Sequence, residues 1–425
     1  MSSAPILVLG GGAAGIFAAI GAAEMGAPVV ILEKKHSLGL KLLMTGNGRC
    51  NLTNTAPLDL FIQQFAEHGP FLYSALNNLS NMDLMNFFAE LGVELKEERG
   101  GRVFPVSDRS KDVLHALTGY LHHLKVQVKL NTRVAGISTG QNRINGVFTE
   151  QGFMPAGAVI LATGGLSYPR TGSTGDGYQW ARELGHTVTP LRPSLVPLET
   201  VEDWVKELRG LSLQHVQVTA WSNHRKVGEQ RGEMLFTHFG VSGPAILNLS
   251  RNVVRALANG PVKVLINLRP GIDRETQHKQ LSAGFQRHAA KHLKNALVDL
   301  LPQRLIKTVT AYSNLPAEKP VHQLTRMERQ RLCETLQGLP LTISQARPIE
   351  EAMVTSGGIN LKEVNPKTMA SKLIANLYFA GEILDIDGFT GGFNLQAAFS
   401  TGYLAGQSAA VSMNKTREGG PNARQ

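Results

Sequence analysis

The chain has 425 residues, of which 42% are hydrophobic and 18% are charged, and its formal net charge is +10. These values describe a soluble globular protein, and the length favours two or three domains. Its two cysteines, Cys50 and Cys333, lie too far apart in sequence for a metal-ligand motif, so we expect neither a metal site nor a disulfide framework. No segment reads as a signal peptide or a membrane span, and we therefore expect a cytoplasmic protein that does not contact membranes.

Residues 5–35 predict a strand, a tight turn, a helix and a second strand. The apolar run Ile6–Leu9 is short and closed by glycine, as a strand buried on both faces would be. Ala13–Met25 is alanine-rich and long enough for a helix, and Val29–Leu32 is a second short apolar run. This order is typical of an α/β fold with a parallel sheet.

The turn before the helix carries the spacing G-x-G-x-x-G. Gly10 permits the tight turn, Gly12 lets a pyrophosphate approach the backbone, and Gly15 lets the helix pack closely on the strand. Phosphates would lie at the helix N-terminus, where unpaired N–H groups favour anions. Glu33 ends the second strand, where a carboxylate can accept both hydroxyls of an adenosine ribose. The spacing alone is weak evidence, but these features together predict a dinucleotide site.

Residues 39–54 contain so much Gly, Asn and Thr that no regular element is expected. We predict an ordered loop that faces a ligand, because the segment follows the ribose-binding strand; an elaborate surface turn is the alternative. Lys41 and Arg49 would meet phosphate. Neutral hydrogen bonds would come from Thr45, Asn51 and Asn54.

The next part of the chain adds further helices and strands to the same domain. Helical periodicity covers residues 58–91 and 112–124. Alternating residues predict strands within 125–134 and a hairpin partner over 143–153.

A second strand-to-glycine junction begins at residues 158–162, where a buried apolar run enters a glycine-rich loop over 164–177. The loop lacks the full G-x-G-x-x-G spacing, so a second dinucleotide fold with tightly held NADPH is not predicted. Tyr168 and Arg170 in this loop are candidates for lining a substrate pocket.

From residue 191 the pattern changes to short alternating strands, and we expect an inserted unit over roughly 191–350. Within it, residues 273–337 are helical, basic and interrupted by prolines. Residues 269–331 contain twelve Lys and Arg against five Asp and Glu, and thus carry +7 of the net +10. This segment is either an ordinary solvated helical face or a footprint for a polyanion such as RNA.

The chain then returns to the first domain. Residues 376–382 predict a strand that reaches Gly381 and Glu382, and two further glycines precede a small-residue helix over 397–410. The N-terminus of that helix suits an anionic or electron-rich group. We therefore expect the C-terminal part to bind the same ligand as the N-terminal turn.

Three long motifs carry a family resemblance. Residues 46–54 read GNGRCNLTN, residues 236–244 read FTHFGVSGP, and residues 381–396 run from Gly-Glu to Asn-Leu-Gln. Together with the opening turn they resemble the BaiN/RdsA family of NAD(P)/FAD-dependent oxidoreductases, also labelled aminoacetone oxidase-like. The likeness covers nearly the whole chain, including the insert.

The resemblance implies an α/β fold with a discontinuous, Rossmann-like, two-dinucleotide-binding FAD domain. That domain would comprise residues 1–190 and 351–425. An inserted β-barrel domain would comprise residues 191–272 and 338–350, with a basic helical subdomain over 273–337.

The resemblance also implies non-covalent FAD, with NAD(P)H as a transient electron donor. Glu33 would hold the adenosine ribose, Val134 would lend backbone to the adenine, and Glu382 would meet the ribitol. The amides of Asn394 and Leu395 would face the pyrimidine edge of the flavin, where a helix dipole stabilises the anionic reduced form. The expected cofactor-binding residues are Gly10, Gly12, Ala13, Ala14, Gly15, Glu33, Lys34, Lys41, Gly48, Arg49, Cys50, Val134, Thr163, Gly164, Gly381, Glu382, Asn394 and Leu395.

Members of the family are linked to two reductions of a carbon–carbon double bond: in ring enones such as oxidised bile acids, and in uridine of large-subunit ribosomal RNA. Both need a hydride from reduced flavin and a proton from an acid. The basic segment favours the RNA substrate, because neutralised phosphates add affinity. Arg287, Lys291 and Lys294 are the expected RNA contacts. A small-molecule enone or amine oxidoreductase and a flavin-bearing RNA-binding protein without turnover are the alternatives.

Two residues are candidates for the proton donor. Cys50 is suggested by analogy with uridine reductases that use a cysteine, but a small buried residue beside the flavin would have the same sequence. His238 lies in a predicted loop of the insert and could donate a proton or bind substrate, or be a histidine satisfied within a turn. The sequence indicates neither the modified nucleotide nor the oligomeric state.

Overall fold

The computed structural model describes residues 4–418. The chain divides into two compact units: unit 1 comprises Met1–Arg192 and Ile349–Gln425, and unit 2 comprises Pro193–Pro348.

Unit 1 is built on a parallel sheet of five strands. Their order across the sheet is β19-β10-β1-β2-β6, and every neighbouring pair is parallel. The first four strands are buried along their whole length, because each is an uninterrupted run of apolar residues. The strands are β1 (Ile6–Leu9), β2 (Val29–Leu32), β6 (Gln127–Lys129), β10 (Ala158–Leu161) and β19 (Leu377–Phe379).

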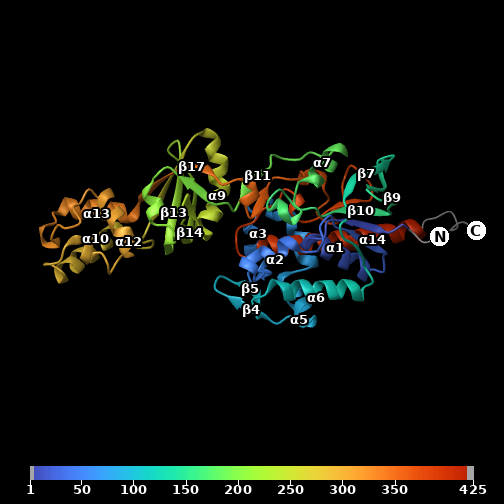
Figure 1. Cartoon of the computed structure of the whole chain (residues 1–425), viewed down its shortest axis with the longest axis horizontal. Helices are drawn as coiled ribbons and strands as arrows, with labels where there is room; N and C mark the ends of the chain where they lie inside the picture. Colours follow the sequence, from blue (N-terminus) through green and yellow to red (C-terminus); the bar gives the residue numbers. More distant parts are fainter. Residues whose placement is uncertain (1–3, 419–425) are drawn as a thin grey trace, which may run out of the picture. The chain divides into compact units, whose positions relative to one another are not determined.

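Two helices from opposite ends of the sequence pack against each other in unit 1 (Figure 1). They are α1 (Ala13–Glu24) and α14 (Phe393–Glu418). Their backbones approach closely at three glycines: a Cβ atom on Gly21 would lie 2.5 Å from the carbonyl oxygen of Tyr403, and one on Gly402 or Gly406 would overlap the backbone of α1. This contact fixes the axis of α14 against the first helix.

Smaller elements complete unit 1. The strands β3 (Thr53–Asn54), β5 (Arg102–Pro105) and β4 (Leu95–Glu98) form one sheet, and β7 (Val134–Gly140), β8 (Arg143–Thr149) and β9 (Gly152–Pro155) form an antiparallel meander. The remaining strand is β18 (Val354–Ser356). The helices are α2 (Leu40–Met44), α3 (Leu58–Gln63), α4 (Tyr73–Asn78), α5 (Asn81–Glu90), α6 (Ser110–His123) and α7 (Asp176–Glu183).

Three predicted segments differ in detail. Residues 39–54, for which no regular element was predicted, contain the helix α2 and end in the strand β3. Residues 58–91 are not one helical run, because the 3-10 helix η2 (Ala66–Leu72) contains Pro70 and because Ser80 starts α5 with a capping box. In the predicted strand region 125–134, the chain turns at Asn131 with a φ of 50° instead of continuing.

Unit 2 contains a closed barrel of six strands, in the order β12-β15-β14-β13-β16-β17. Alternate residues such as Val218, Ala220, Val264 and Ile266 are fully buried, as expected for a barrel interior. The strands are β12 (Leu198–Thr200), β13 (Ser212–Ser222), β14 (Arg225–Phe236), β15 (Gly240–Ser242), β16 (Val262–Asn267) and β17 (Leu339–Ala346), and β11 (Arg192–Ser194) precedes them.

The helices of unit 2 include a group in which α10, α12 and α13 gather together (Figure 1). Buried residues of α10 and α13, such as Leu281 and Leu336, belong to the same core as the barrel strands. The helices are α8 (Trp204–Glu207), α9 (Pro244–Ala256), α10 (Arg274–Arg287), α11 (Leu293–Ala296), α12 (Gln303–Tyr312) and α13 (Arg326–Gln337). The predicted fold class, an α/β protein with a parallel Rossmann-like sheet, a β-barrel and additional helices, is therefore confirmed.

Candidate functional site

A cavity in unit 1 lies at the carboxyl ends of four parallel strands. Gly10, Glu33, Ala162 and Gly381 follow β1, β2, β10 and β19 within two residues, and all four line the cavity. Open α/β sheets bind ligands at this edge. The site therefore joins segments from the two ends of the chain.

The glycines of the opening turn have different structural roles. Gly10 has a φ of 107°, and a Cβ atom there would lie 2.6 Å from the carbonyl oxygen of Ala162. A Cβ atom on Gly15 would overlap the carbonyl oxygen of Gly10, so both positions are closed to side chains by the protein itself. A Cβ atom on Gly12 would meet no protein atom within 4 Å, and Gly12 lines the cavity. The space beside Gly12 is thus open to a ligand.

Glu33 is held in place by backbone N–H groups at one end of the cavity. Its Oε2 accepts a hydrogen bond of 2.7 Å from the amide of Gly11, and its Oε1 accepts one of 2.8 Å from the amide of Lys35. Only 8% of the residue is exposed. Val134 lines the same cavity as Glu33.

An ion pair joins the end of β2 to the glycine-rich loop before α7. Lys34 Nζ lies 2.8 Å from Oδ2 of Asp176 and also hydrogen-bonds Thr174. Burial raises the pKa of Asp176, but the hydrogen bonds from Lys34 and Thr174 outweigh it, and the pKa lies below its usual value. Asp176 therefore remains ionised and paired where this loop meets the cavity.

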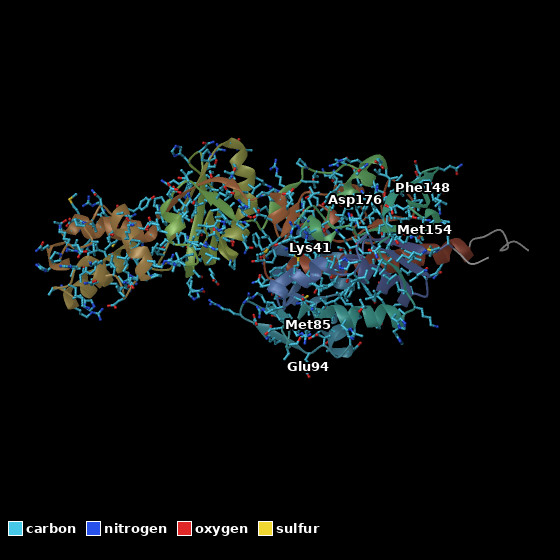
Figure 2. All side chains as sticks on the ribbon, viewed as in Figure 1. Lys41, Met85, Glu94, Phe148, Met154 and Asp176 are labelled. Carbon is cyan, nitrogen blue, oxygen red and sulfur yellow. The ribbon has the colours of Figure 1, made fainter. Side chains whose placement is uncertain are left out.

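A polar cluster surrounds Lys41, a cavity-lining residue of α2 that is labelled in Figure 2. Lys41 Nζ lies 2.6 Å from Glu382 Oε2 and 2.6 Å from Ser167 Oγ. Glu382 Oε1 accepts hydrogen bonds from Ser167 Oγ at 3.0 Å and from the amide of Thr355 at 2.8 Å. The Glu382 carboxylate is therefore fixed by three donors from three distant parts of the chain.

The first turn of α14 also lines the cavity, through Asn394 and Leu395. The Asn394 side chain closes a local ring: its Oδ1 accepts from the amide of Gly388 at 2.8 Å, and its Nδ2 donates to the carbonyl oxygen of Gly388 at 2.8 Å. The cavity thus borders the N-terminus of α14, which is the positive end of the helix dipole.

Most of the predicted cofactor-binding residues are brought together in this one cavity. Those that line it are Gly10, Gly12, Ala13, Ala14, Glu33, Lys34, Lys41, Val134, Thr163, Gly164, Gly381, Glu382, Asn394 and Leu395. Gly15, Gly48, Arg49 and Cys50 are outside the lining. Gly15 serves packing, as the overlap with Gly10 shows, and Gly48 ends the 3-10 turn that precedes Arg49.

Arg49 was predicted to meet phosphate, and the structure gives it protein partners instead. Its guanidinium lies 2.8 Å from Glu98 and 3.2 Å from Asp108, and its Cζ is 4.1 Å from the ring centroid of Phe104. The hydrogen bond to Glu98 raises the pKa of Arg49. The carboxylates of Glu98 in β4 and of Asp108 therefore neutralise the charge of Arg49.

Cys50 is a poor candidate for the proton donor in this structure. The residue is fully buried, and burial raises the pKa of its thiol to about 12. A useful general acid has a pKa near the operating pH. The burial of Cys50 therefore favours the alternative that the sequence left open, a small buried residue.

The candidate substrate residues lie outside the cavity lining. Tyr168 is half-buried, with a backbone φ of 53° and an amide that donates to the carbonyl oxygen of Glu350, and burial raises the pKa of its hydroxyl. Arg170 is exposed. In unit 2, His238 is exposed beside the ring of Phe239, with 4.9 Å between ring centroids.

The basic helical segment of unit 2 has both free and paired cations. Arg287, Lys291 and Lys294 are exposed, and Lys294 Nζ lies 2.6 Å from Glu318. Other cations of the segment also pair with carboxylates: Arg274 with Glu334, Lys279 with Glu275, Lys307 with Glu207, and Lys319 with Glu328. Local pairing lowers the positive charge that a polyanion would meet.

The sequence did not single out Ser167, Thr355, Asp176 or Thr401 as parts of the site. Each binds a predicted residue: Ser167 and Thr355 hold Glu382, Asp176 holds Lys34, and the Thr401 hydroxyl accepts from the amide of Gly381 at 3.0 Å. Their only sequence signal is that they lie in or near the glycine-rich loop, β18 and α14. Such partners are set by tertiary packing.

Within residues 4–418, no group of His, Cys, Asp or Glu side chains is arranged to hold a metal ion. In the same part of the chain, every helix is too short or too polar to cross a membrane.

Comparisons with known proteins agree with this architecture. The family described as HI0933-like protein Rossmann domain matches residues 4–408. A 3-dehydro-bile acid delta(4,6)-reductase from Clostridium scindens is 34% identical over 95% of this chain and 98% of its own. A ribosomal RNA dihydrouridine synthase from Haemophilus influenzae is 30% identical over 95% of this chain and 97% of its own.

A solved structure shares the fold at low sequence identity. The 3-ketosteroid delta1-dehydrogenase from Sterolibacterium denitrificans is 14% identical, with a TM-score of 0.52 and coverage of 96% of this chain and 99% of that chain. The family match confirms the resemblance carried by the three sequence motifs. The chain belongs to the HI0933-like, or BaiN/RdsA, family of flavin-type oxidoreductases, and it is an enzyme.

Proposed function

We propose that this enzyme binds FAD and reduces a carbon–carbon double bond, with uridine of large-subunit ribosomal RNA as its substrate and dihydrouridine as the product. One observation carries the first part: a single cavity is lined by Glu33 from the N-terminal strand–turn–helix and by Glu382 and Asn394 from the C-terminal return. These two groups of residues, from opposite ends of the chain, suit the two ends of one long dinucleotide.

The donor and acceptor groups of the cavity fit FAD. Glu33 offers a carboxylate for ribose hydroxyls, and Gly12 leaves open space for a pyrophosphate beside the N-terminus of α1. Thr163 lines the cavity with a buried hydroxyl that has no protein partner among the described residues. A ligand would satisfy this hydroxyl, because buried polar groups are normally hydrogen-bonded. The lining residues given by the structure include no Cys, His or Tyr, so we propose non-covalent binding.

Reduced FAD, when bound, supplies the hydride for an electron-poor carbon of the substrate, and we propose NAD(P)H as the transient donor that reduces it. The residues of the chain bind and orient. Glu33 would hold the adenosine end of FAD, and Lys41 and Glu382 would offer polar groups to the ribitol. The N–H groups of the first turn of α14 would stabilise negative charge on the pyrimidine edge.

The two candidates for the proton donor, Cys50 and His238, differ in exposure. Burial argues against Cys50, whereas His238 is exposed, and histidine is the side chain most often used as a general acid. We keep His238 as the candidate donor. A His238→Gln variant that reoxidises as fast as the wild type in a single turnover with substrate would exclude it.

Two observations support ribosomal RNA as the substrate: the net charge of +10 and the relative named as a ribosomal RNA dihydrouridine synthase. We propose Arg287, Lys291 and Lys294 as phosphate contacts. Such an enzyme would work in the cytoplasm. The alternative substrate is a small ring enone, favoured by the 34% identity to the bile acid reductase. In that case the basic segment would be an ordinary solvated surface.

The test measures dihydrouridine in ribosomal RNA from a strain that lacks the gene and from the same strain with the gene restored. The RNA proposal expects loss of one dihydrouridine and its return. Unchanged dihydrouridine, together with reoxidation of the NADPH-reduced enzyme by a ring enone and not by RNA, would favour the small-molecule alternative. A Glu33→Ala variant that fails to restore the modification would tie the activity to the cavity.

A further inference from the structure

The segment over residues 45–54, which ends in β3, makes side-chain contacts with the turn that starts α14. Asn54 is 3% exposed, and its Nδ2 donates to the carbonyl oxygens of Gly391 at 3.0 Å and Gly100 at 2.9 Å. Its Oδ1 accepts from the amide of Ala56 at 2.9 Å. The amide of Asn54 is therefore fully engaged between two distant segments.

Asn51 holds the next residue of the same turn. In the amide orientation that pairs donors with acceptors, its side-chain oxygen accepts from the amide of Gly392 at 3.0 Å. Its side-chain nitrogen then donates to the carbonyl oxygens of Thr53 at 3.1 Å and Val103 at 3.2 Å. Two asparagines, three residues apart, thus bind two successive glycines from the other end of the chain.

The backbone conformation of this turn leaves little freedom. Gly391 has a φ of 132° and Gly392 a φ of 96°, and both angles are unfavourable for residues with a Cβ atom. A Cβ atom on Gly392 would overlap the carbonyl oxygen of Thr53, and one on Gly391 would lie 2.7 Å from the ring of Phe393. The turn therefore packs closely against β3, so a shift of β3 would also shift the turn.

The turn lies directly before the part of α14 that faces the cavity. The helix begins at Phe393, and Asn394 and Leu395 line the cavity. Further along, the helix axis is fixed against α1 through Gly402 and Gly406. The asparagine contacts therefore help to set the position of the first turn of α14 relative to the cavity.

We propose that Asn54 and Asn51 are positioning residues that hold the N-terminus of α14 against the pyrimidine edge of the flavin, and thereby set how strongly the protein stabilises negative charge on it. Neither residue lines the cavity, so both act through the Gly391–Gly392 turn. The inference rests on the proposed FAD site. The positive end of a helix acts only over its first turn, so a small retreat of that turn weakens the interaction.

The main variants are Asn54→Ala and Asn51→Ala, and Asn81→Ala is the matched control. Asn81, the first residue of α5, donates through Nδ2 to the carbonyl oxygens of Asn54 at 2.7 Å and Ala56 at 3.1 Å. This control therefore removes an asparagine amide that binds the same segment but has no hydrogen bond to the Gly391–Gly392 turn among those the structure shows. Asn54→Ser serves as a milder replacement should Asn54→Ala fail to fold.

The first measurement is the dissociation constant of sulfite from the FAD-bound protein. Sulfite adds through sulfur to N5 of oxidised flavin and leaves a negative charge on the pyrimidine ring, which makes it a probe of this stabilisation. We expect sulfite to bind five- to tenfold more weakly to Asn54→Ala than to the wild type. The two-electron potential of the flavin should fall in parallel, because a tenfold change in an equilibrium constant corresponds to about 30 mV for a two-electron couple. Asn81→Ala should match the wild type. Wild-type sulfite affinity and potential in FAD-loaded Asn54→Ala and Asn51→Ala would overturn the proposal.

The second measurement is hydrogen exchange in the apoprotein, which does not depend on the cofactor. The amides of residues 393–398 should exchange faster in Asn54→Ala and Asn51→Ala than in the wild type, with exchange in α1 unchanged. Equal exchange of residues 393–398 in all proteins would overturn the positioning role. Failure of the wild type to bind FAD would instead overturn the proposed function, whatever the exchange result.

Discussion

Lys41 Nζ lies 2.6 Å from Oε2 of Glu382, although 341 positions separate the two residues in the sequence. Both side chains line the cavity, and they are 23% and 18% exposed. The pair joins α2 to the strand end that returns from the C-terminal part of the chain, so it closes one side of the site.

Replacing Lys41 by Met should weaken both the site and the fold. Glu382 would keep its hydrogen bonds from Ser167 and Thr355 but lose its only charged donor shown in the structure. Because the pair is partly exposed, we expect the free energy of unfolding to fall by roughly 1–2 kcal/mol, and FAD affinity to fall by about tenfold. Denaturant unfolding and FAD titration of the apoprotein would measure these. Lys111→Met, on the exposed face of α6, is the control and should change neither.

Two glycine substitutions should distinguish a glycine that leaves space for the ligand from one that allows close packing of the protein. Gly12→Ala adds a methyl group where no protein atom lies within 4 Å, so the apoprotein should keep its stability while FAD affinity falls at least tenfold. Gly15→Ala forces an overlap with Gly10 and should cost roughly 1–3 kcal/mol of stability. Thermal unfolding of the apoproteins and FAD titration distinguish the two. Equal stability losses would contradict the assignment of Gly12 to the ligand space.

Cys50→Ala should retain the reaction. The thiol is buried, burial raises its pKa to about 12, and Cys50 is not among the residues that line the cavity. We expect reoxidation of reduced enzyme by substrate within about twofold of the wild-type rate, and no alkylation of Cys50 by iodoacetamide at neutral pH until the protein unfolds. A rate lowered on the order of a hundredfold, with FAD content intact, would restore Cys50 as the proton donor.

Stability should fall with acidification because of His186. Its side chain is fully buried, with Nδ1 3.2 Å from Glu363 and Nε2 2.9 Å from Ser371, and burial lowers the pKa of the imidazole despite the carboxylate. The folded state disfavours the protonated ring, so stability is fully present above the ordinary pKa of 6.5 and is lost as the pH falls through and below it.

Glu363 acts in the same direction at lower pH. Burial raises the pKa of its carboxyl, but hydrogen bonds from Thr187 and His186 outweigh burial and bring the pKa below its usual value. We expect the urea concentration at the midpoint of unfolding to fall in the wild type when the pH is lowered from about 7 to about 5. The fall should be smaller in His186→Gln, which cannot take up a proton. The same pH dependence in both proteins would show that other groups dominate.

Local sequence patterns predicted the part of the site that is local in space. The G-x-G-x-x-G turn, the strand before it and Glu33 lie within one strand–turn–helix–strand unit, and the structure places Gly10, Gly12 and Glu33 at one cavity. The returning strand with Gly381 and Glu382 could be predicted as well, because its glycine, acid and following helix repeat the same local pattern. In these cases the backbone geometry of a few consecutive residues decides where the side chain lies.

Partner choice could not be predicted in the same way. Arg49 has the charge and the loop position of a phosphate ligand, yet it pairs with Glu98 and Asp108, which lie 49 and 59 residues further along the chain. Cys50 follows it in the same motif and is buried. Both outcomes depend on how β3, β4 and β5 pack, and no spacing in the sequence encodes that packing.

The sequence by itself therefore determined the fold class and the family, because strand, turn and helix signals act over short distances and recur in order along the chain. Only the tertiary structure decided that Lys41 binds Glu382, that Ser167 and Thr355 fix the same carboxylate, and that Asn54 holds the turn at Gly391. These contacts join segments up to 341 residues apart, and they exist because the parallel sheet brings the ends of β1, β2, β10 and β19 to a single edge.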